Sequence, residues 1–105
     1  VDYTPEAVVT GSQDIPFVES LLAELQGSFG IDPTRVVAAG FSNGAILSYA
    51  LARWRSELFP RVAGVAGLAD FGPFTFERRL DMLHIHGTRD RFVPYEGGKT
   101  ARKDV

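Results

Sequence analysis

The sequence predicts an α/β fold built on a parallel β-sheet. Three apolar runs of strand length, at residues 36–39, 61–68 and 80–86, alternate with loops or with segments of helical periodicity, a pattern typical of such sheets. The second indication is the pentapeptide GFSNG at residues 40–44, which lies between the first apolar run and a helix-forming segment. The chain has 105 residues, which is enough for at most one domain.

Residues 14–29 predict an amphipathic helix that packs on the sheet. Apolar side chains recur at helical spacing from Ile15 to Phe29, and polar residues fall on the other face. We expect Asp14 to be the N-cap, and Pro16 fits the first turn because no helical hydrogen bond needs its missing N–H. Gly30 is expected to end the helix.

The second helix should follow the pentapeptide directly. An Asp-Pro turn over residues 31–35 leads into the strand at residues 36–39, which is apolar on both faces, as in a buried parallel strand. The helix after the pentapeptide is expected to run to about Glu57 and to end before Pro60. Trp54, near its end, is interpreted as packing at the sheet edge rather than as a platform for substrate.

The strand at residues 61–68 is rich in small residues, which would let a helix pack closely against it. The loop that follows contains Phe71, Phe74 and Phe76, which either line an apolar acyl site or fill a gap under the loop. Residues 1–13 are expected to form a loop, and residues 99–105 to begin a helix.

The pentapeptide has the G-x-S-x-G pattern of a nucleophile elbow. In such an elbow the serine lies on a tight, strained turn, where Gly40 and Gly44 would avoid a clash with the backbone. Ser42 would be the nucleophile, and the N–H of Asn43 would form part of the oxyanion hole. The alternative is a strand–turn–helix with an incidental serine, but the strand-like and helix-forming flanks favour the nucleophile.

A serine nucleophile needs a base, and an acid that orients the base. In hydrolases with this elbow the order along the chain is serine, acid, histidine. Asp90 follows the end of the third predicted strand and is the predicted acid, with Asp70 as the weaker candidate. The alternative for Asp90 is a structural role, because aspartate is common as a cap in turns.

The two histidines of the chain, His84 and His86, both precede Asp90. Their spacing should place both rings on one face of the strand. We expect His84 to pack inside and His86 to brace the loop that carries Asp90 through a hydrogen bond. The catalytic histidine is therefore expected outside this chain. A metal site is disfavoured because the pair lacks a third ligand at convincing spacing.

Composition narrows the remaining function classes. A net charge of -2 and a pI near 5.6 favour neither a nucleic-acid partner nor an anionic membrane surface. No apolar run is long enough to span a bilayer. The chain has no cysteine, which excludes a thiol nucleophile, a disulfide framework and cysteine-ligated zinc. The predicted chemistry requires no cofactor.

Five segments together resemble the poly(3-hydroxybutyrate) depolymerase and feruloyl esterase group of the α/β-hydrolases. They are DIPFV at 14–18, IDPTRV at 31–36, GFSNG at 40–44, HIHGTRD at 84–90 and VPYEGG at 93–98. The resemblance covers nearly all of the chain from Asp14 to Gly98. It departs from the group at Ala45, where such enzymes commonly carry another glycine.

The resemblance implies a secreted, extracellular serine esterase with an α/β-hydrolase fold. In it Ser42 would attack the ester carbonyl, Asp90 would orient the histidine and the Asn43 amide would supply half of the oxyanion hole. The implied substrates are small-molecule or polymeric esters: polyhydroxyalkanoate polyesters or their oligomers, or feruloyl and acetyl esters on plant polysaccharide. A peptidase or acyl-transferase of the same fold, and a non-catalytic remnant or interaction module, are the alternatives.

Two parts that the group carries are not found in this sequence. One is the upstream strand whose His-Gly loop supplies the second oxyanion donor, and the other is the downstream Gly-His loop that supplies the base. In addition, three parallel strands with few helices leave sheet faces and edges uncovered. We therefore expect residues 1–105 to be the middle-to-late part of a larger α/β-hydrolase domain, inactive without the rest.

Overall fold

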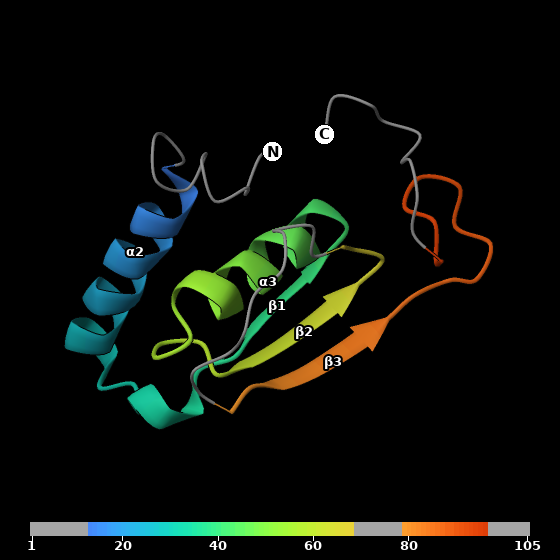
Figure 1. The fold of residues 1–105 in the computed structure, drawn as a ribbon. Helices are drawn as coiled ribbons and strands as arrows, with labels where there is room; N and C mark the ends of the chain where they lie inside the picture. Colours follow the sequence, from blue (N-terminus) through green and yellow to red (C-terminus); the bar gives the residue numbers. More distant parts are fainter. Residues whose placement is uncertain (1–12, 69–78, 97–105) are drawn as a thin grey trace.

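The computed structural model describes residues 13–68 and 79–96. Their core is a three-stranded sheet in the order β1-β2-β3, formed by β1 (Ala38–Phe41), β2 (Arg61–Val65) and β3 (Asp81–Ile85). Both neighbouring pairs are parallel, which confirms the predicted fold class. The helix α3 (Asn43–Trp54) lies over one face of the sheet, and α2 (Asp14–Phe29) lies on the side of α3 away from β3 (Figure 1).

The helix α2 has the predicted ends but a different N-cap. Gly30 adopts a left-handed conformation, with φ of 62°, and its N–H donates to the carbonyl of Gln26, as expected of a C-terminal glycine. The prediction of Asp14 as N-cap is wrong. The cap is Gln13, and Asp14 lies inside the first turn, where its carboxylate favours the positive end of the helix dipole.

The strand β1 begins two residues later than predicted. A 3₁₀ turn, η1 (Pro33–Arg35), precedes it, with the Asp32 carboxylate accepting the Thr34 N–H. Pairing starts at Ala38 with Val62 and continues through Phe41 with Val65, so that only Ser42 lies between the strand and α3. The prediction that residues 36–39 are buried on both faces is also wrong in the described part of the chain, where Val37 is 56% exposed.

The helix α3 supplies most of the buried core. It ends at Trp54 rather than near Glu57, because Arg55 leaves the helical conformation and the chain turns towards Phe59. Trp54 is partly buried and packs against the core, and the Arg53 guanidinium lies 4.2 Å from its ring centroid. Its packing at the sheet edge stays a prediction. The buried apolar residues are Ile15, Ala45, Ile46, Tyr49, Ala50, Leu51, Ala52, Phe59 and Val62.

The strands β2 and β3 are shorter than the apolar runs that predicted them. The strand β2 stops at Val65 because Ala66 takes a positive φ of 56°. Close packing of a helix on this strand is confirmed at Gly64, where a Cβ would lie 2.2 Å from the Tyr49 hydroxyl oxygen. The predictions for residues 1–12, 69–78 and 97–105, which include Asp70 and the three phenylalanines, lie outside the described residues.

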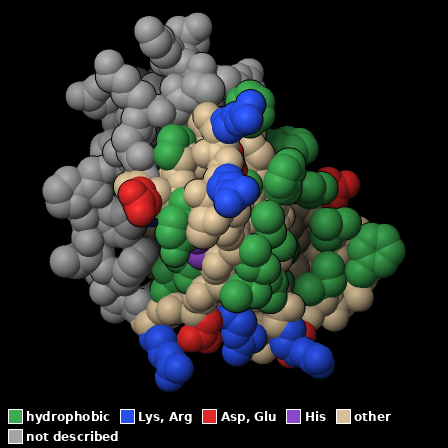
Figure 2. Space-filling view, turned by 90° about the vertical axis from the view of Figure 1, so that its right-hand side faces the viewer, with side chains coloured by type: hydrophobic (Ala, Val, Ile, Leu, Met, Phe, Trp, Pro, Cys, Tyr) green, Lys and Arg blue, Asp and Glu red, His purple; other side chains and the backbone are tan. Residues whose placement is uncertain are grey.

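The face of the sheet opposite α3 is apolar and exposed in the described part of the chain. Phe41, Val65 and Ile85 lie side by side in the register of the strands, and each is more than one third exposed. Viewed from the side of the molecule that lies on the right in Figure 1, hydrophobic side chains form a broad surface, and histidine shows only at the bottom of a gap (Figure 2). Parallel sheets are normally covered on both faces.

Candidate active site

Ser42 occupies a strained turn between the last residue of β1 and the first residue of α3. Its backbone has φ of 55° and ψ of -112°, a conformation that costs a residue with a Cβ about 1–3 kcal/mol. The turn is held on both sides, because the Ser42 N–H donates to the Val65 carbonyl at 2.8 Å and the Ser42 carbonyl accepts from the Ile46 N–H at 3.1 Å. The predicted strain at this serine is present.

The steric explanation for the flanking glycines holds for Gly40 and is wrong for Gly44. A Cβ on Gly40 would lie 2.2 Å from the carbonyl carbon and oxygen of Gly44 and 2.7 Å from the Ala45 nitrogen. A Cβ on Gly44 would meet no described atom within 4 Å other than its chain neighbours and the backbone of its own helix. Only Gly40 is therefore required by the close approach, since its Cα faces the backbone of the first turn of α3.

A second strained residue, which the sequence did not reveal, lies at the end of the neighbouring strand. Ala66 donates its N–H to the Ile85 carbonyl at 2.8 Å and turns the chain with a positive φ. This turn brings Gly67 against the start of α3, where a Cβ would lie 2.4 Å from the Ala45 Cβ and 3.2 Å from the Ser42 carbonyl oxygen. The loop after β2 therefore packs directly against the Ser42 turn.

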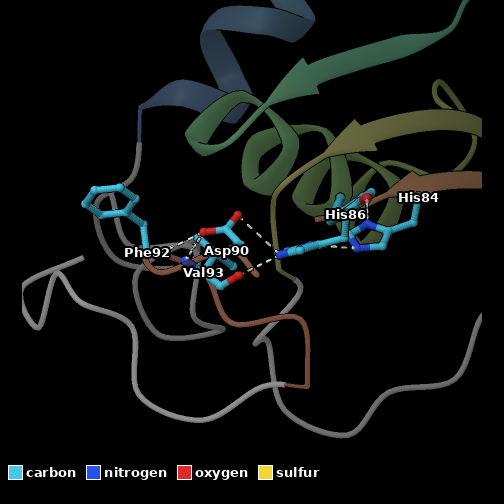
Figure 3. A network of polar contacts seen from close by, with 6 residues as sticks. His84, His86, Asp90, Phe92 and Val93 are labelled. Carbon is cyan, nitrogen blue, oxygen red and sulfur yellow. Dashed lines mark hydrogen bonds and ion pairs between the residues drawn. The ribbon is translucent and has the colours of Figure 1, made fainter. Parts of the chain in front are cut away.

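Asp90 lies in the loop after β3, with its carboxylate turned inward (Figure 3). Its Oδ1 accepts the backbone N–H groups of Phe92 and Val93, each at 2.9 Å, and its side chain is 16% exposed. These two hydrogen bonds, helped by the nearby His86, lower the pKa of Asp90. Asp90 therefore does cap this turn, the alternative role considered for it. The cap uses Oδ1 and leaves Oδ2 without a backbone donor in the described residues.

His86 braces this loop, as predicted. Its side chain is 3% exposed, and its Nε2 lies 2.6 Å from the Val93 carbonyl oxygen and 3.5 Å from Asp90 Oδ2. His84 lies on the same face, with the two ring centroids 5.2 Å apart. The prediction that His84 packs inside is wrong, because it stands exposed on an edge strand of the described sheet. Its Nδ1 instead contacts the hydroxyl of Tyr49, a partner 35 residues away.

The described residues contain no group of three or more histidine, cysteine or acidic side chains that could hold a metal ion. They also contain no helix that is long and apolar enough to cross a membrane.

The two predicted site residues lie at the same edge of the sheet. Ser42 directly follows β1 and Asp90 follows β3, and the carboxyl ends of parallel strands all meet at one edge. One strand, β2, separates β1 from β3, so two strand spacings, about 10 Å, lie between the strands that carry the two groups. Binding sites of open α/β sheets lie at this edge.

The parallel sheet with α3 on one face is the architecture of an α/β fold fragment. The sequence model of the phospholipase/carboxylesterase family matches residues 10–105. The chain therefore belongs to this family.

Individual relatives carry esterase names. The putative esterase NocK of Nocardia uniformis subsp. tsuyamanensis is 33% identical over 94 residues, which cover 88% of this chain and 27% of NocK. Feruloyl esterase C of Emericella nidulans is 31% identical over 91 residues, 87% of this chain and 34% of the enzyme. The bifunctional acetylxylan esterase/xylanase XynS20E of Neocallimastix patriciarum is 26% identical over 88 residues, 84% of this chain and 13% of that protein. The chain thus spans about a third or less of the length of these relatives.

Proposed function

We propose that this chain supplies the nucleophile and the acid of a serine carboxylic-ester hydrolase. The observation that carries the proposal is the strained turn that holds Ser42 between a parallel strand and the start of α3. Such a turn lifts the serine hydroxyl clear of the sheet edge. The family match and the esterase relatives support the same reaction class.

In the first half of the reaction the Ser42 Oγ attacks the ester carbonyl as a histidine takes its proton. The N–H of Asn43, in the first turn of α3, donates to the oxygen that becomes negative, and the helix dipole favours that charge. The histidine then returns the proton to the leaving alcohol as the carbon–oxygen bond breaks, which leaves an acyl group on Ser42. Water, activated by the same histidine, releases the acid and restores the serine.

Asp90 is proposed to orient that histidine. Its Oδ1 is occupied by two backbone N–H groups, so Oδ2 is the oxygen available to an imidazole N–H. We place the base outside these 105 residues, because both histidines of the chain are already engaged. His86 contacts the Val93 carbonyl, and His84 contacts Tyr49 and His86.

For the substrate we propose feruloyl or acetyl esters on plant polysaccharide. The support is the names of the relatives, which include several feruloyl esterases and one acetylxylan esterase. Plant polysaccharides are too large to cross membranes, so the proposal includes action outside the cell. Polyhydroxyalkanoate oligomers are the second candidate. The serine turn itself does not determine the leaving group or the acceptor of the acyl group. Peptidase or acyl-transferase activity is therefore an alternative that the same test addresses.

The test uses the full-length protein with p-nitrophenyl acetate, methyl ferulate, hydroxybutyrate oligomers and a peptide substrate. The Ser42→Ala variant is expected to lower kcat/KM for the preferred ester by about 10³-fold or more. Ser56→Ala, beyond the end of α3, is the matched control and should retain full activity. Ester hydrolysis that survives in Ser42→Ala would contradict the proposal and favour a non-catalytic role for this region.

We also expect the isolated chain of 105 residues to turn over substrate at a negligible rate. Loss of the base from a catalytic triad costs orders of magnitude in rate. Hydrolysis by the isolated chain that depends on both Ser42 and Asp90 would show that it contains its own base.

A further inference from the structure

Four groups form one continuous hydrogen-bonded chain from α3 through β3 to the loop of Asp90. The Tyr49 hydroxyl contacts His84 Nδ1, His84 Nε2 lies 3.1 Å from His86 Nδ1, and His86 Nε2 lies 2.6 Å from the Val93 carbonyl oxygen. Figure 3 shows the two rings side by side, with His86 pointing towards Asp90 and Val93. The mechanism above does not use Tyr49 or His84.

The end of this chain fixes the direction of every bond in it. The Val93 carbonyl can only accept, so His86 Nε2 must carry a proton and donate it. A neutral imidazole has one N–H, so His86 Nδ1 accepts from His84 Nε2. His84 Nδ1 then accepts from the Tyr49 hydroxyl. With both rings neutral, each histidine is therefore restricted to its Nε2–H tautomer.

The fold makes room for this chain at a glycine. Gly64 on β2 is paired in register with His84 on β3, and Tyr49 lies over it. A Cβ on Gly64 would lie 2.2 Å from the Tyr49 hydroxyl oxygen and 2.4 Å from the ring carbon that bears it. The absence of a side chain here lets a tyrosine from α3 cross the middle strand and reach the edge strand.

The groups that face the two rings are compatible with the Nε2–H tautomer of each ring. From α3 the neighbour is Tyr49, and burial raises the pKa of its hydroxyl, which therefore stays protonated. From the loop they are Asp90, with Oδ2 3.5 Å from His86 Nε2, and Tyr95, whose ring centroid is 6.0 Å from that of His86. The strand β2 contributes Gly64 and no ionisable group.

We infer that Tyr49, His84 and His86 act together as positioning residues for Asp90. The chain holds the Val93 carbonyl and the His86 N–H against the loop, which fixes the direction in which Asp90 Oδ2 points. The inference rests on the proposed function only for the consequence in catalysis. The tautomers can be tested without it.

The first experiment records ¹⁵N–¹H correlations of the histidine rings in the full-length protein at about pH 8, where an ordinary imidazole is neutral. We expect both rings as Nε2–H tautomers. A neutral Nδ1–H tautomer of either ring would overturn the inference.

The second experiment compares kcat per folded molecule for two replacements of His86. His86→Leu removes the donor to Val93 and should lower kcat for the preferred ester about tenfold, with KM changed less than about twofold. His86→Gln keeps an N–H for Val93 and an acceptor for His84, and should restore most of the loss. Unchanged kcat in His86→Leu, or no rescue by His86→Gln, would show that the role is merely structural.

Two further variants separate the possible failures. Tyr49→Phe keeps the ring over Gly64 and removes the first donor, so it tests the chain if His86→Leu does not fold, with an expected loss in kcat of about threefold. Tyr95→Phe, beside His86 but outside the chain, should leave kcat unchanged. If Ser42→Ala still hydrolyses ester, the proposed function fails, and the ring tautomers alone then support or overturn the inference.

Discussion

The two halves of the candidate site are held by different forces. The Ser42 turn is fixed by backbone sterics: Gly40 touches the first turn of α3, and Gly67 fills the space between Ala45 and the Ser42 carbonyl. The Asp90 loop is fixed by polar contacts from its own carboxylate and from His86. The Ser42 turn should therefore be sensitive to the volume of its neighbours at any pH, and the Asp90 loop to the charge of its carboxylate.

The largest loss of stability is expected from a replacement of Gly40. The Gly40→Ala replacement places a Cβ 2.2 Å from backbone atoms of Gly44, which cannot rotate away, so the turn or the helix start must move. Overpacking of this kind costs about 3 kcal/mol in the free energy of unfolding, and activity should fall with the displaced Ser42. Urea unfolding of the full-length protein measures the loss of stability, and ester hydrolysis measures the loss of activity.

Gly44→Ala is the matched control for Gly40→Ala. Its Cβ meets no described atom within 4 Å other than its chain neighbours and the backbone of its own helix, and alanine is favoured over glycine in a helix by about 1 kcal/mol. The replacement should be neutral or stabilising. Equal damage from the two replacements would show that the turn depends on both glycines, as the sequence pattern alone suggests.

Gly67→Ala should have the next largest effect. The new Cβ would lie 2.4 Å from the Ala45 Cβ, a contact between two side chains that a small shift of the loop after β2 can relieve. We expect a loss of about 1–2 kcal/mol in the free energy of unfolding, smaller than at Gly40. The double replacement Gly67→Ala/Ala45→Gly removes the opposing methyl group and should recover part of this loss. Absence of recovery would place the clash elsewhere.

The sequence predicted those features that depend on neighbouring residues. The end of α2 follows from Gly30, and the serine turn follows from a strand, a glycine and a helix start in succession. Asp90 and the bracing role of His86 were predicted from their order along the chain and their place at a strand end. Whether Ser42 and Asp90 are the catalytic nucleophile and acid stays a prediction.

Features that depend on distant contacts were missed. The shift of β1 is set by its register with Val62, more than 20 residues away, and no local signal gives that register. The positive φ of Ala66 arises where β2 leaves the sheet to pack on α3, a conformation that alanine does not predict. The exposure of His84 and its contact with Tyr49 depend on β3 being an edge strand in the described residues.

Acid should weaken the Asp90 loop and spare the serine turn. The pKa of Asp90 is lowered in the folded protein by hydrogen bonds from Val93 and Phe92, relative to about 3.9 in the unfolded chain. The folded state thus binds its proton less readily, so this stabilisation is present above about pH 4 and is lost as the pH falls through the lower, folded pKa. The effect should be smaller than that of Gly40→Ala or Gly67→Ala, because acid removes only the charge of Asp90 and leaves an acceptor for the two N–H groups.

The measurement compares unfolding of the wild type, Asp90→Asn and Asp90→Ala as a function of pH. Asn keeps an acceptor for the two N–H groups and loses the charge, so its difference from the wild type should vanish at the acidic end. Ala loses the acceptor as well and should remain less stable throughout. A difference between Asn and the wild type that persists unchanged into acid would show that the charge of Asp90 does not stabilise this loop.

The smallest loss of stability is expected from breaking an ion pair that lies outside the Ser42 turn and the Asp90 loop. Arg55 Nε lies 2.5 Å from Glu19 Oε1 and joins the end of α3 to α2, but both side chains are about one third exposed. Pairs screened by water in this way contribute about 0.5 kcal/mol, so Glu19→Gln should lower the free energy of unfolding by about that amount, and less at high salt. It should leave kcat unchanged, because α2 lies on the side of α3 away from β3 and contributes no group to the site. A loss of activity in Glu19→Gln, measured with the same ester as Ser42→Ala, would show that the serine turn depends on charge as well as on sterics.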